Sequence, residues 1–354
     1  MSDNPKEAER EMEKAIFISG DCWLAVFDLL PPFQLGLGIA LISHRFDRRV
    51  DEHFKTRKWR LNKQLLIQLD IEENGIKQMQ IVKSDGNPLP IPQKPLPNKV
   101  IGFRRIEIIY IDQNVVEFLR RFHRFFAVNS TKLNIVTENV RISEFVLLNI
   151  WPMLRDGVHV LSLNTITFRR LRQLASLLSD CQSLRCVSFS FNAAIFPAFP
   201  PDDSAMASDG QAVAKWLFTP HPDGLPKWLN CSVNSPDQWS STMEQLKTAF
   251  SNASSPVTFR IFLTHSSTLI DSVVPFDLIN EVTGEKLTLE QEDTDAFVLS
   301  RCPIGWDQMK WENVQDELHT PLNRIRFFIG DGGLDEGLLT PLLAGRVITD
   351  QQQK

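Results

Sequence analysis

The chain has 354 residues, a formal net charge of -5, 43% hydrophobic residues and 23% charged residues. This length allows two or three domains of roughly 100 to 200 residues each, and the composition is typical of a globular protein. The acidic balance argues against nucleic acid as the main partner and against adhesion to a membrane surface. The longest apolar stretch, 23–42, contains Asp28, two prolines and Gln34, so we expect no membrane-spanning helix.

The N-terminal residues 1–14 alternate acidic and basic side chains, which predicts a disordered terminus and not a signal peptide. The chain also has five cysteines at scattered positions, without a Cys-x-x-Cys pair. Disulfide frameworks are typical of short secreted chains, so we expect free thiols in a reducing compartment. These features predict a protein of the cytoplasm, the nucleus or both.

Residues 15–61 have the pattern of a helical module. Asp21 is well placed to cap a first helix, and Pro31-Pro32 must end it because proline lacks a backbone N–H and restricts the residue before it. Between them, apolar residues fall at i, i+3, i+4 and i+7 on one helix face: Trp23, Val26, Phe27 and Leu30.

A second apolar element follows at 35–46, and a third, basic element at 44–63 contains eight Lys/Arg and three Asp/Glu. The second element is apolar on more than one side. Two short helices with more apolar surface than they can bury between themselves need a partner, which is either the next domain or another protein.

The residue order of this module resembles an F-box, the short helical module that docks a substrate receptor onto a Skp-type adaptor and through it onto the cullin of a ubiquitin ligase. The resemblance rests on residues 21–31, on Gln34-Leu35 and on residues 40–46. One position departs from the family pattern, because Ile18-Ser19 stands where a Leu-Pro pair usually opens the motif.

The resemblance implies a three-helix F-box that binds the adaptor through these anchors: Trp23, Leu24, Phe27, Leu30, Pro31, Leu35 and Ile42. It also implies a protein-binding subunit that brings a target protein to the ligase for ubiquitination and has no catalytic activity itself. The target, and any modification that it needs for recognition, do not follow from the resemblance.

The sequence contains none of the motifs sought as signs of an enzyme. It has no Gly-x-x-x-x-Gly-Lys-Ser/Thr phosphate loop, no His-Glu-x-x-His metal pair and no Gly-x-Ser-x-Gly nucleophile elbow. We therefore expect a chain without catalytic residues, without a cofactor and without a metal site.

From residue 62 to 265, short apolar strands alternate with helical patterns. Four strand positions lie 26 or 27 residues apart: Ile106, Leu133, Val160 and Cys186. One strand and one helix in about 20 to 29 residues are typical of a leucine-rich-repeat-like solenoid. The fourth unit also has Asn192 at the position where such repeats use an Asn side chain to tie the turn after the strand. A doubly wound α/β domain would give the same alternation, so both arrangements stay open.

Residues 193–227 have the Pro, Gly, Ser and Asp content of a loop insertion around one short helical piece at 212–217. The period continues beyond it, because the next strand positions, Cys231 and Phe259, lie 28 residues apart. The insertion therefore interrupts the array without ending it.

Residues 266–330 predict a small β-meander followed by a helix, and residues 331–354 predict a flexible tail. The predicted fold class is thus α+β or α/β, with a three-helix F-box, an irregular leucine-rich-repeat-like strand-helix array and a small β-rich C-terminal piece. This layout resembles the expanded F-box families of nematode type.

The N-terminal helices allow a second interpretation, in which they only cap the apolar end of the solenoid in a non-enzymatic repeat scaffold. The solubility of a chain shortened to residues 62–354 distinguishes the two interpretations. It should aggregate if the helices are a cap and stay soluble if they are a docking module. The sequence does not distinguish a ligase subunit from an F-box protein that works outside any ligase.

Overall fold

The chain forms two compact units in the computed structural model. The first consists of Met1–Trp59 and Pro97–Val100, and the second of Arg60–Leu96 and Ile101–Lys354. The predicted disordered terminus, 1–14, and residues 339–354 of the predicted tail lie outside the described residues. The structure describes residues 18–30, 35–56, 59–71, 77–83, 88–89, 100–127, 130–137, 139–163, 174–189, 195–204, 206–233, 236–265, 273–293 and 296–338.

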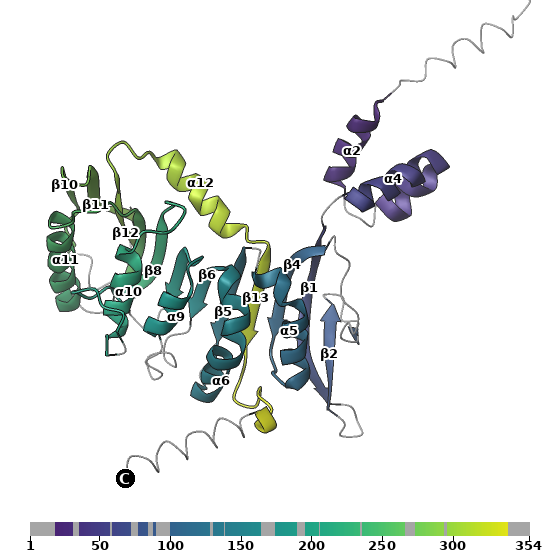
Figure 1. Ribbon diagram of the computed structural model, residues 1–354, viewed down its shortest axis with the longest axis horizontal. Helices are drawn as coiled ribbons and strands as arrows, with labels where there is room; N and C mark the ends of the chain where they lie inside the picture. Colours follow the sequence, from purple (N-terminus) through teal and green to yellow (C-terminus); the bar gives the residue numbers. More distant parts are fainter. Residues whose placement is uncertain are drawn as a thin grey trace, which may run out of the picture. The chain divides into compact units, whose positions relative to one another are not determined.

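The first helix of the N-terminal unit, α2 (Gly20–Leu29), ends just before the two prolines, as predicted (Figure 1). The predicted cap was wrong. The Ser19 hydroxyl caps α2 by accepting a hydrogen bond from the Cys22 backbone N at 3.3 Å. Asp21 lies in the first turn, where its negative carboxylate interacts favourably with the positive end of the helix dipole.

The second predicted element of this unit consists of two short helical turns of different type and is not a regular α-helix. A π-helical turn, η1 (Leu35–Ile39), leads into a 3-10 turn, η2 (Ala40–Ile42). The third, basic element is a true helix, α4 (His44–Thr56). The chain then enters a strand at Trp59.

The second unit is built on one mixed sheet that has 13 strands in the described part of the chain. The strands are β1 (Trp59–Ile71), β2 (Lys77–Lys83), β3 (Pro88–Leu89), β4 (Val100–Ile108), β5 (Thr131–Val136), β6 (Val158–Leu163), β7 (Cys186–Phe189), β8 (Lys227–Val233), β9 (Phe259–His265), β10 (Phe276–Asn280), β11 (Glu285–Asp293), β12 (Ala296–Pro303) and β13 (Asn323–Phe328). Their order in the sheet is β10-β11-β12-β9-β8-β7-β6-β5-β13-β4-β1-β2-β3. The centre, from β4 to β9, is parallel, and β12, β11 and β10 continue it antiparallel.

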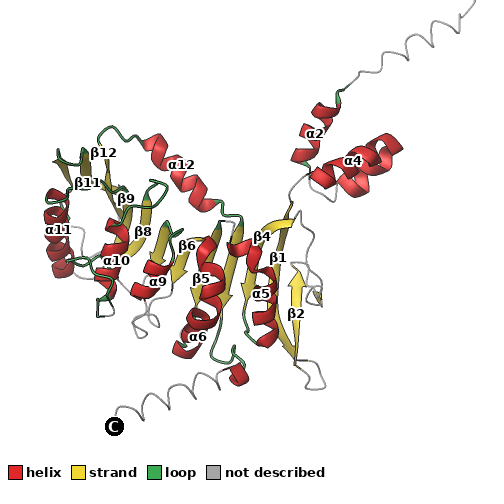
Figure 2. Cartoon of the chain, in the orientation of Figure 1, coloured by secondary structure: helices red, strands yellow, loops and turns green. Residues whose placement is uncertain are grey.

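The strands from β5 to β9 follow one another in the sheet in chain order. Right-handed crossovers between such strands place the connecting helices on one face, and Figure 2 shows the helices gathered on that face. A doubly wound sheet would instead reverse its strand order and carry helices on both faces. The helices of this unit are α5 (Gln113–Ala127), α6 (Val140–Phe145), η3 (Val146–Ile150), α7 (Trp151–Leu154), η4 (Arg155–Gly157), α9 (Leu174–Asp180), α10 (Asp209–Phe218), α11 (Pro236–Ser251), α12 (Gln308–His319) and η6 (Glu336–Leu338).

The core of the second unit forms between the helices and the strand residues that point toward them. Burial alternates along β5, where Leu133 and Ile135 are fully buried, as the two-residue period of a strand requires. On β4, the Phe103 ring packs edge-on against Phe125 of α5, with ring centroids 5.6 Å apart. Aromatic and aliphatic burial of this kind is the main force that holds helices onto a sheet.

The predicted C-terminal β-meander belongs to the same sheet as the strands before it. The strands β10, β11 and β12 form the predicted meander, but they extend the same sheet through the pairing of β12 with β9. The last strand, β13, is inserted between β4 and β5, where Ile325 pairs with both Ile106 and Leu133. Periodicity identifies a strand but not its neighbours, and so the sequence could not show this insertion.

The predicted loop insertion contains the helix that was expected at 212–217, which the structure extends to the whole of α10. A capping box begins this helix, because Ser208 and Gln211 exchange hydrogen bonds between side chain and backbone. The turn residue Asn192 lies outside the described residues, so the proposed Asn tie remains a prediction.

Candidate functional site

The N-terminal unit has a small core of its own. Phe27, Leu35 and Val50 are buried at its centre. The Trp23 ring stands edge-on to Phe46, with centroids 4.7 Å apart. Other partly buried side chains complete the core: Leu30, Ile39, Ala40 and Phe54.

The predicted adaptor anchors therefore fall into two groups. Phe27 and Leu35 are fully buried within the unit, and Trp23 and Leu30 pack against them, so these four support the fold. Leu24 is 37% exposed and Ile42 is 64% exposed, which leaves them free to contact a partner. Pro31 lies outside the described residues.

Three further apolar residues of this unit are exposed: Val26, which the helical period placed on the apolar face, and Leu29 and Leu41, which it did not. Leu29 is 84% exposed. A small unit that exposes this much aliphatic surface has the character of an interaction site. Sequence reasoning assigned Val26 to the buried face and overlooked the other two, because it ranked residues by the core face of the helix.

Among the helices that the structure describes, α12 alone lies across the other face of the parallel sheet, which we call the open face (Figure 1). Trp311, Val314 and Leu318 of α12 pack against one row of strand residues: Val160, Cys186 and Trp228. These three are cross-strand neighbours on β6, β7 and β8. The helix thus covers the apolar part of this face.

A polar row lies beside the apolar one, two residues further along each strand. Its members are direct cross-strand neighbours on β5 to β8, and each is half-buried: Asn134, Ser162, Ser188 and Asn230. Ser162, Ser188 and Asn230 line a groove of about 370 Å³ whose other wall includes Gln315 and His319 of α12. Side-chain amides and hydroxyls in such a row can bind polar groups of an extended chain.

Each end of the open face has a basic side chain. Lys132 lines the groove at its β5 end, and beyond it Arg326 of β13 lies 3.6 Å from Glu107 of β4. At the other end, Arg260 lies over the aromatic rings of Trp228 and Trp311, at 5.7 Å and 5.1 Å from their centroids. Such contacts hold a guanidinium by cation–π attraction.

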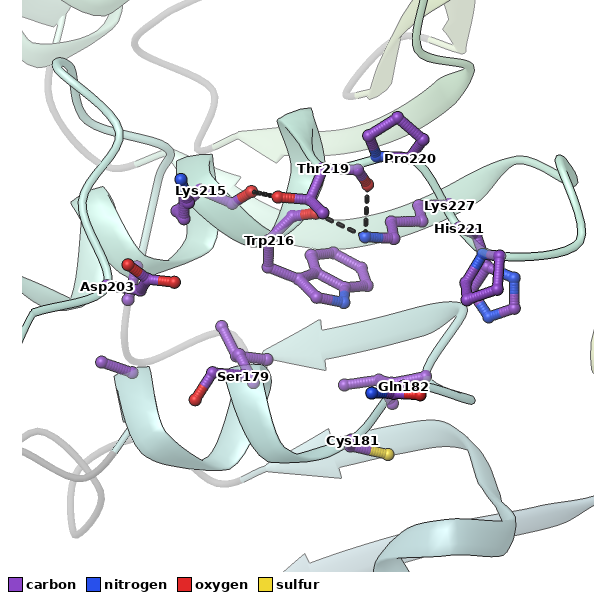
Figure 3. A pocket seen from close by; sticks show the side chains of 15 residues that line it. Ser179, Cys181, Gln182, Asp203, Lys215, Trp216, Thr219, Pro220, His221 and Lys227 are labelled. Carbon is purple, nitrogen blue, oxygen red and sulfur yellow. Dashed lines mark hydrogen bonds between the residues drawn. The ribbon is translucent and has the colours of Figure 1, made fainter.

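A second hollow, of about 480 Å³, lies on the helical side of the sheet between α9 and α10 (Figure 3). Figure 3 shows Trp216, Lys227 and His221 along one wall, with Ser179, Cys181 and Gln182 across from them. The wall also contains apolar side chains, among them Leu178 and Leu184. We call this hollow the α9–α10 cavity.

Lys227, which lines this cavity, caps the C-terminal end of α10. Its Nζ donates hydrogen bonds of 2.6 Å to the carbonyl oxygens of Trp216 and Thr219, at the helix end where carbonyls have no partner within the helix. Burial lowers the pKa of Lys227 to about 8. The lysine therefore serves as a C-terminal cap with a desolvated ammonium group.

His221 forms a polar cluster with Asp223 and Arg185 at the rim. The His221 Nδ1 lies 2.5 Å from Asp223 Oδ1, and Arg185 forms an ion pair with the same carboxylate. Arg185 also contacts Glu317 of α12 at 3.2 Å. Burial lowers the pKa of His221 to about 4, and the charges of Arg185 and Lys227 add to this effect.

Sequence reasoning missed the α9–α10 cavity. Its polar wall comes from α10 and the turn after it, both inside the segment 193–227 that composition marked as a loop. The only local feature of the sequence that could have indicated this cavity is a Trp and a His five residues apart, Trp216 and His221.

Comparisons with known proteins do not assign the chain to a family: no family model, no curated protein and no solved structure matches it. Among the described residues, no group of three or more His, Cys, Asp or Glu side chains is placed to hold a metal ion. No described helix is both long and apolar enough to cross a membrane.

Proposed function

We propose that the chain is the substrate receptor of a Skp-cullin ubiquitin ligase, with the N-terminal unit as its F-box and a leucine-rich-repeat-like array as its target-binding part. The observation that carries the proposal is the division of apolar residues in the N-terminal unit. The unit buries Phe27 and Leu35 in its own core, yet exposes Leu24 and Ile42.

The exposed residues are the proposed adaptor contacts. Burial of apolar side chains in a partner's groove is favourable, and a few central residues dominate such interfaces at about 2 kcal/mol or more each. Under this proposal Leu24 and Ile42 contact the Skp-type adaptor, whereas Trp23, Phe27, Leu30 and Leu35 hold the helices in position. Pro31, which lies outside the described residues, stays a predicted adaptor contact.

The open face of the sheet is the proposed target-binding surface. The unbroken order of β5 to β9 supports a solenoid-like array, because stacked strand-helix units leave one strand face free for a partner. The polar row beside α12 supplies hydrogen-bonding groups, from Asn134 to Asn230. The target is a protein, and the cullin is reached through the adaptor.

The grouping of the N-terminal helices into a compact unit of their own supports a docking module. A cap would be expected to share the core of the repeats that it covers. The repeat scaffold without a ligase therefore ranks second.

Co-expression of the full chain with a Skp-type adaptor, followed by size-exclusion chromatography, tests the proposal. We expect a one-to-one complex with the wild-type chain. The paired change Leu24→Asp with Ile42→Asp should abolish co-elution, because two lost anchors weaken binding by about 4 kcal/mol, roughly a thousandfold. Both residues are exposed, so the unit should keep its fold, which circular dichroism checks.

The matched control places the same charges on exposed apolar residues of the second unit, Leu148→Asp with Ile279→Asp. This variant should co-elute with the adaptor as the wild type does. A wild-type chain that never co-elutes would overturn the receptor proposal, and co-elution of the Leu24→Asp, Ile42→Asp chain would overturn the assigned contact surface.

A further inference from the structure

The polar row beside α12 has hydrogen-bonding groups that the protein itself does not use. In the described part of the chain, no side chain of the row has a hydrogen-bond partner: Asn134, Ser162, Ser188 and Asn230. All four are half-buried, and solvent reaches their polar atoms. A side-chain amide or hydroxyl can both donate and accept. The row can therefore bind the N–H and C=O groups of a partner's backbone.

The β5 end of the groove beside α12 is basic. Lys132 lines the groove there, and its cross-strand neighbour on β13 is Arg324. Like charges on directly neighbouring strand positions repel each other. Among the described residues, neither side chain forms an ion pair with a carboxylate. Arg324 instead donates to the His319 carbonyl at 2.6 Å, where α12 ends. An anionic group between the two cations would relieve their repulsion.

The surroundings of this basic end leave positive charge over. Arg326 of β13 and Arg105 of β4 both contact the same carboxylate, that of Glu107, at 3.6 Å and 3.3 Å. One carboxylate offsets one positive charge of the two. The described lining of the groove contains Lys132 and His319 but no Asp or Glu. The groove therefore has the charge to attract an acidic ligand.

The length of the groove suits a short stretch of extended chain. Its lining runs from Lys132 on β5 to Phe262 on β9, which are four strand spacings apart in the sheet. At roughly 4.8 Å per spacing this is roughly 19 Å, the length of about six residues in an extended chain. Such a chain would cross the strands and meet the polar row along its whole length.

We propose that this groove binds an extended, acidic segment of a target protein, with a carboxylate between Lys132 and Arg324 and with its backbone on the polar row. The inference rests on the proposed function, in which the open face binds the target, and it adds the chemistry of that target. Nucleic acid fits less well. Its phosphates need a cation at regular intervals, whereas the polar row beyond Lys132 is uncharged.

Four fluorescently labelled probes of similar length test the chemistry: peptides of alternating Asp-Ser, Asn-Ser and Lys-Ser, and a single DNA strand of thymidine only. The full chain is titrated into each probe without adaptor, and fluorescence anisotropy reports binding. The Asp-Ser peptide should bind tightest. The Asn-Ser peptide has the same backbone and size but no charge, so it should bind about tenfold more weakly, because hydrogen bonds to charged groups are the stronger ones. The Lys-Ser peptide should bind weakest.

Variants identify the contacts. Lys132→Met removes the ammonium group but keeps most of the stem, so it should weaken the Asp-Ser peptide by about tenfold and leave the Asn-Ser peptide unchanged. Ser162→Ala with Ser188→Ala removes two groups of the polar row and should weaken both peptides several-fold. Lys215→Met is the matched control, because Lys215 is exposed on α10, on the helical side of the sheet. It should bind all probes as the wild type does.

Four results would overturn the proposal. They are equal binding of the Asp-Ser and Asn-Ser peptides, binding of the Asp-Ser peptide that Lys132→Met does not change, tighter binding of the DNA strand than of any peptide, and binding of none of the probes. Since Lys132→Met is judged by the difference between two peptides on the same protein, a general loss of structure would not imitate the expected result.

The peptide titrations contain no adaptor, so they are independent of the co-elution test. A chain that co-elutes with the adaptor but binds no peptide would overturn the acidic target and keep the receptor. A chain that binds the Asp-Ser peptide but never co-elutes would keep the groove and overturn the receptor.

Discussion

The side-chain amide of Asn323 binds the backbone of Phe103, 220 residues away in the sequence, with Oδ1 accepting from the Phe103 N at 2.8 Å. The same amide donates to the carbonyl of Phe125 at 2.7 Å, and Asn323 is fully buried. One residue at the start of β13 thus joins β4 to the end of α5. This arrangement fixes the last strand in the middle of the sheet.

We predict that Asn323→Leu lowers the free energy of unfolding by about 2 to 4 kcal/mol, because it removes the acceptor of the buried Phe103 N–H and a hydrogen bond to the Phe125 carbonyl. Urea denaturation at pH 7 measures the change. Asn114→Leu is the control, since the Asn114 side chain is exposed and donates to the Asp112 carboxylate at the surface, and should cost less than about 0.5 kcal/mol. Equal effects of the two changes would contradict the role of Asn323.

Gly102→Ala should disturb the same contact. A Cβ at Gly102 would lie 2.5 Å from Asn323 Oδ1, closer than van der Waals contact allows, so the amide must move. We expect a loss of about 1 to 3 kcal/mol. The double variant with Asn323→Leu should lose less than the sum of the single losses, because both act on one contact. Additive losses in urea denaturation would show that they act independently.

The pair of Glu285 and Arg301 should be costly to break from one side. Both side chains are 1% exposed, and Arg301 donates to Glu285 at 2.6 Å while Glu285 accepts from the Val257 N at 2.8 Å. Glu285→Leu leaves a buried guanidinium without its carboxylate and should cost about 3 to 5 kcal/mol. Thermal and urea unfolding measure this loss.

Replacing both partners, Glu285→Leu with Arg301→Met, should cost much less than the two single changes together, because no charge is left buried. The surface pair of Glu244 and Lys247 gives the control, since Glu244→Leu should change stability by less than about 1 kcal/mol. A double variant as unstable as the sum of its parts would refute the coupling.

Lys227 should make stability increase with pH. Burial lowers its pKa from an ordinary value of 10.5 to about 8. Between these values the unfolded chain binds the proton more fully than the folded chain does, so the free energy of unfolding rises as pH rises. Lys227→Met lacks this titration. The free energy of unfolding of the wild type should therefore rise relative to that of Lys227→Met between pH 8 and 10.5. A difference between the two proteins that stays constant with pH in urea denaturation would contradict this.

Thiol labelling should separate Cys22 from the other four cysteines. All five are free, and Cys22 alone among them is exposed. Burial raises the pKa of Cys181 and of Cys186 to about 12, and only the thiolate reacts. Iodoacetamide at pH 8 should modify one thiol per folded chain and five in urea, as counted by mass spectrometry. More than one rapid modification of the folded chain would show that the second unit opens readily.

Local sequence determined the elements of both units. The period of Trp23, Phe27 and Leu30 predicted α2, and the prolines after Leu30 predicted its end. The strand β6 begins and ends where its apolar pattern does, at Val158 and Leu163. Such features depend on neighbours within a few residues, which the sequence displays directly.

Only the tertiary structure decided which side chains meet. The apolar stripe of the N-terminal helices does not say which residues face inward, and the structure buries Phe27 and Leu35 while it exposes Leu24 and Ile42. Likewise, β13 pairs with strands about 190 to 220 residues before it, and Trp216 and His221 line one cavity only because α10 packs on α9. Contacts between distant segments depend on the packing of the whole chain, and no local pattern encodes them.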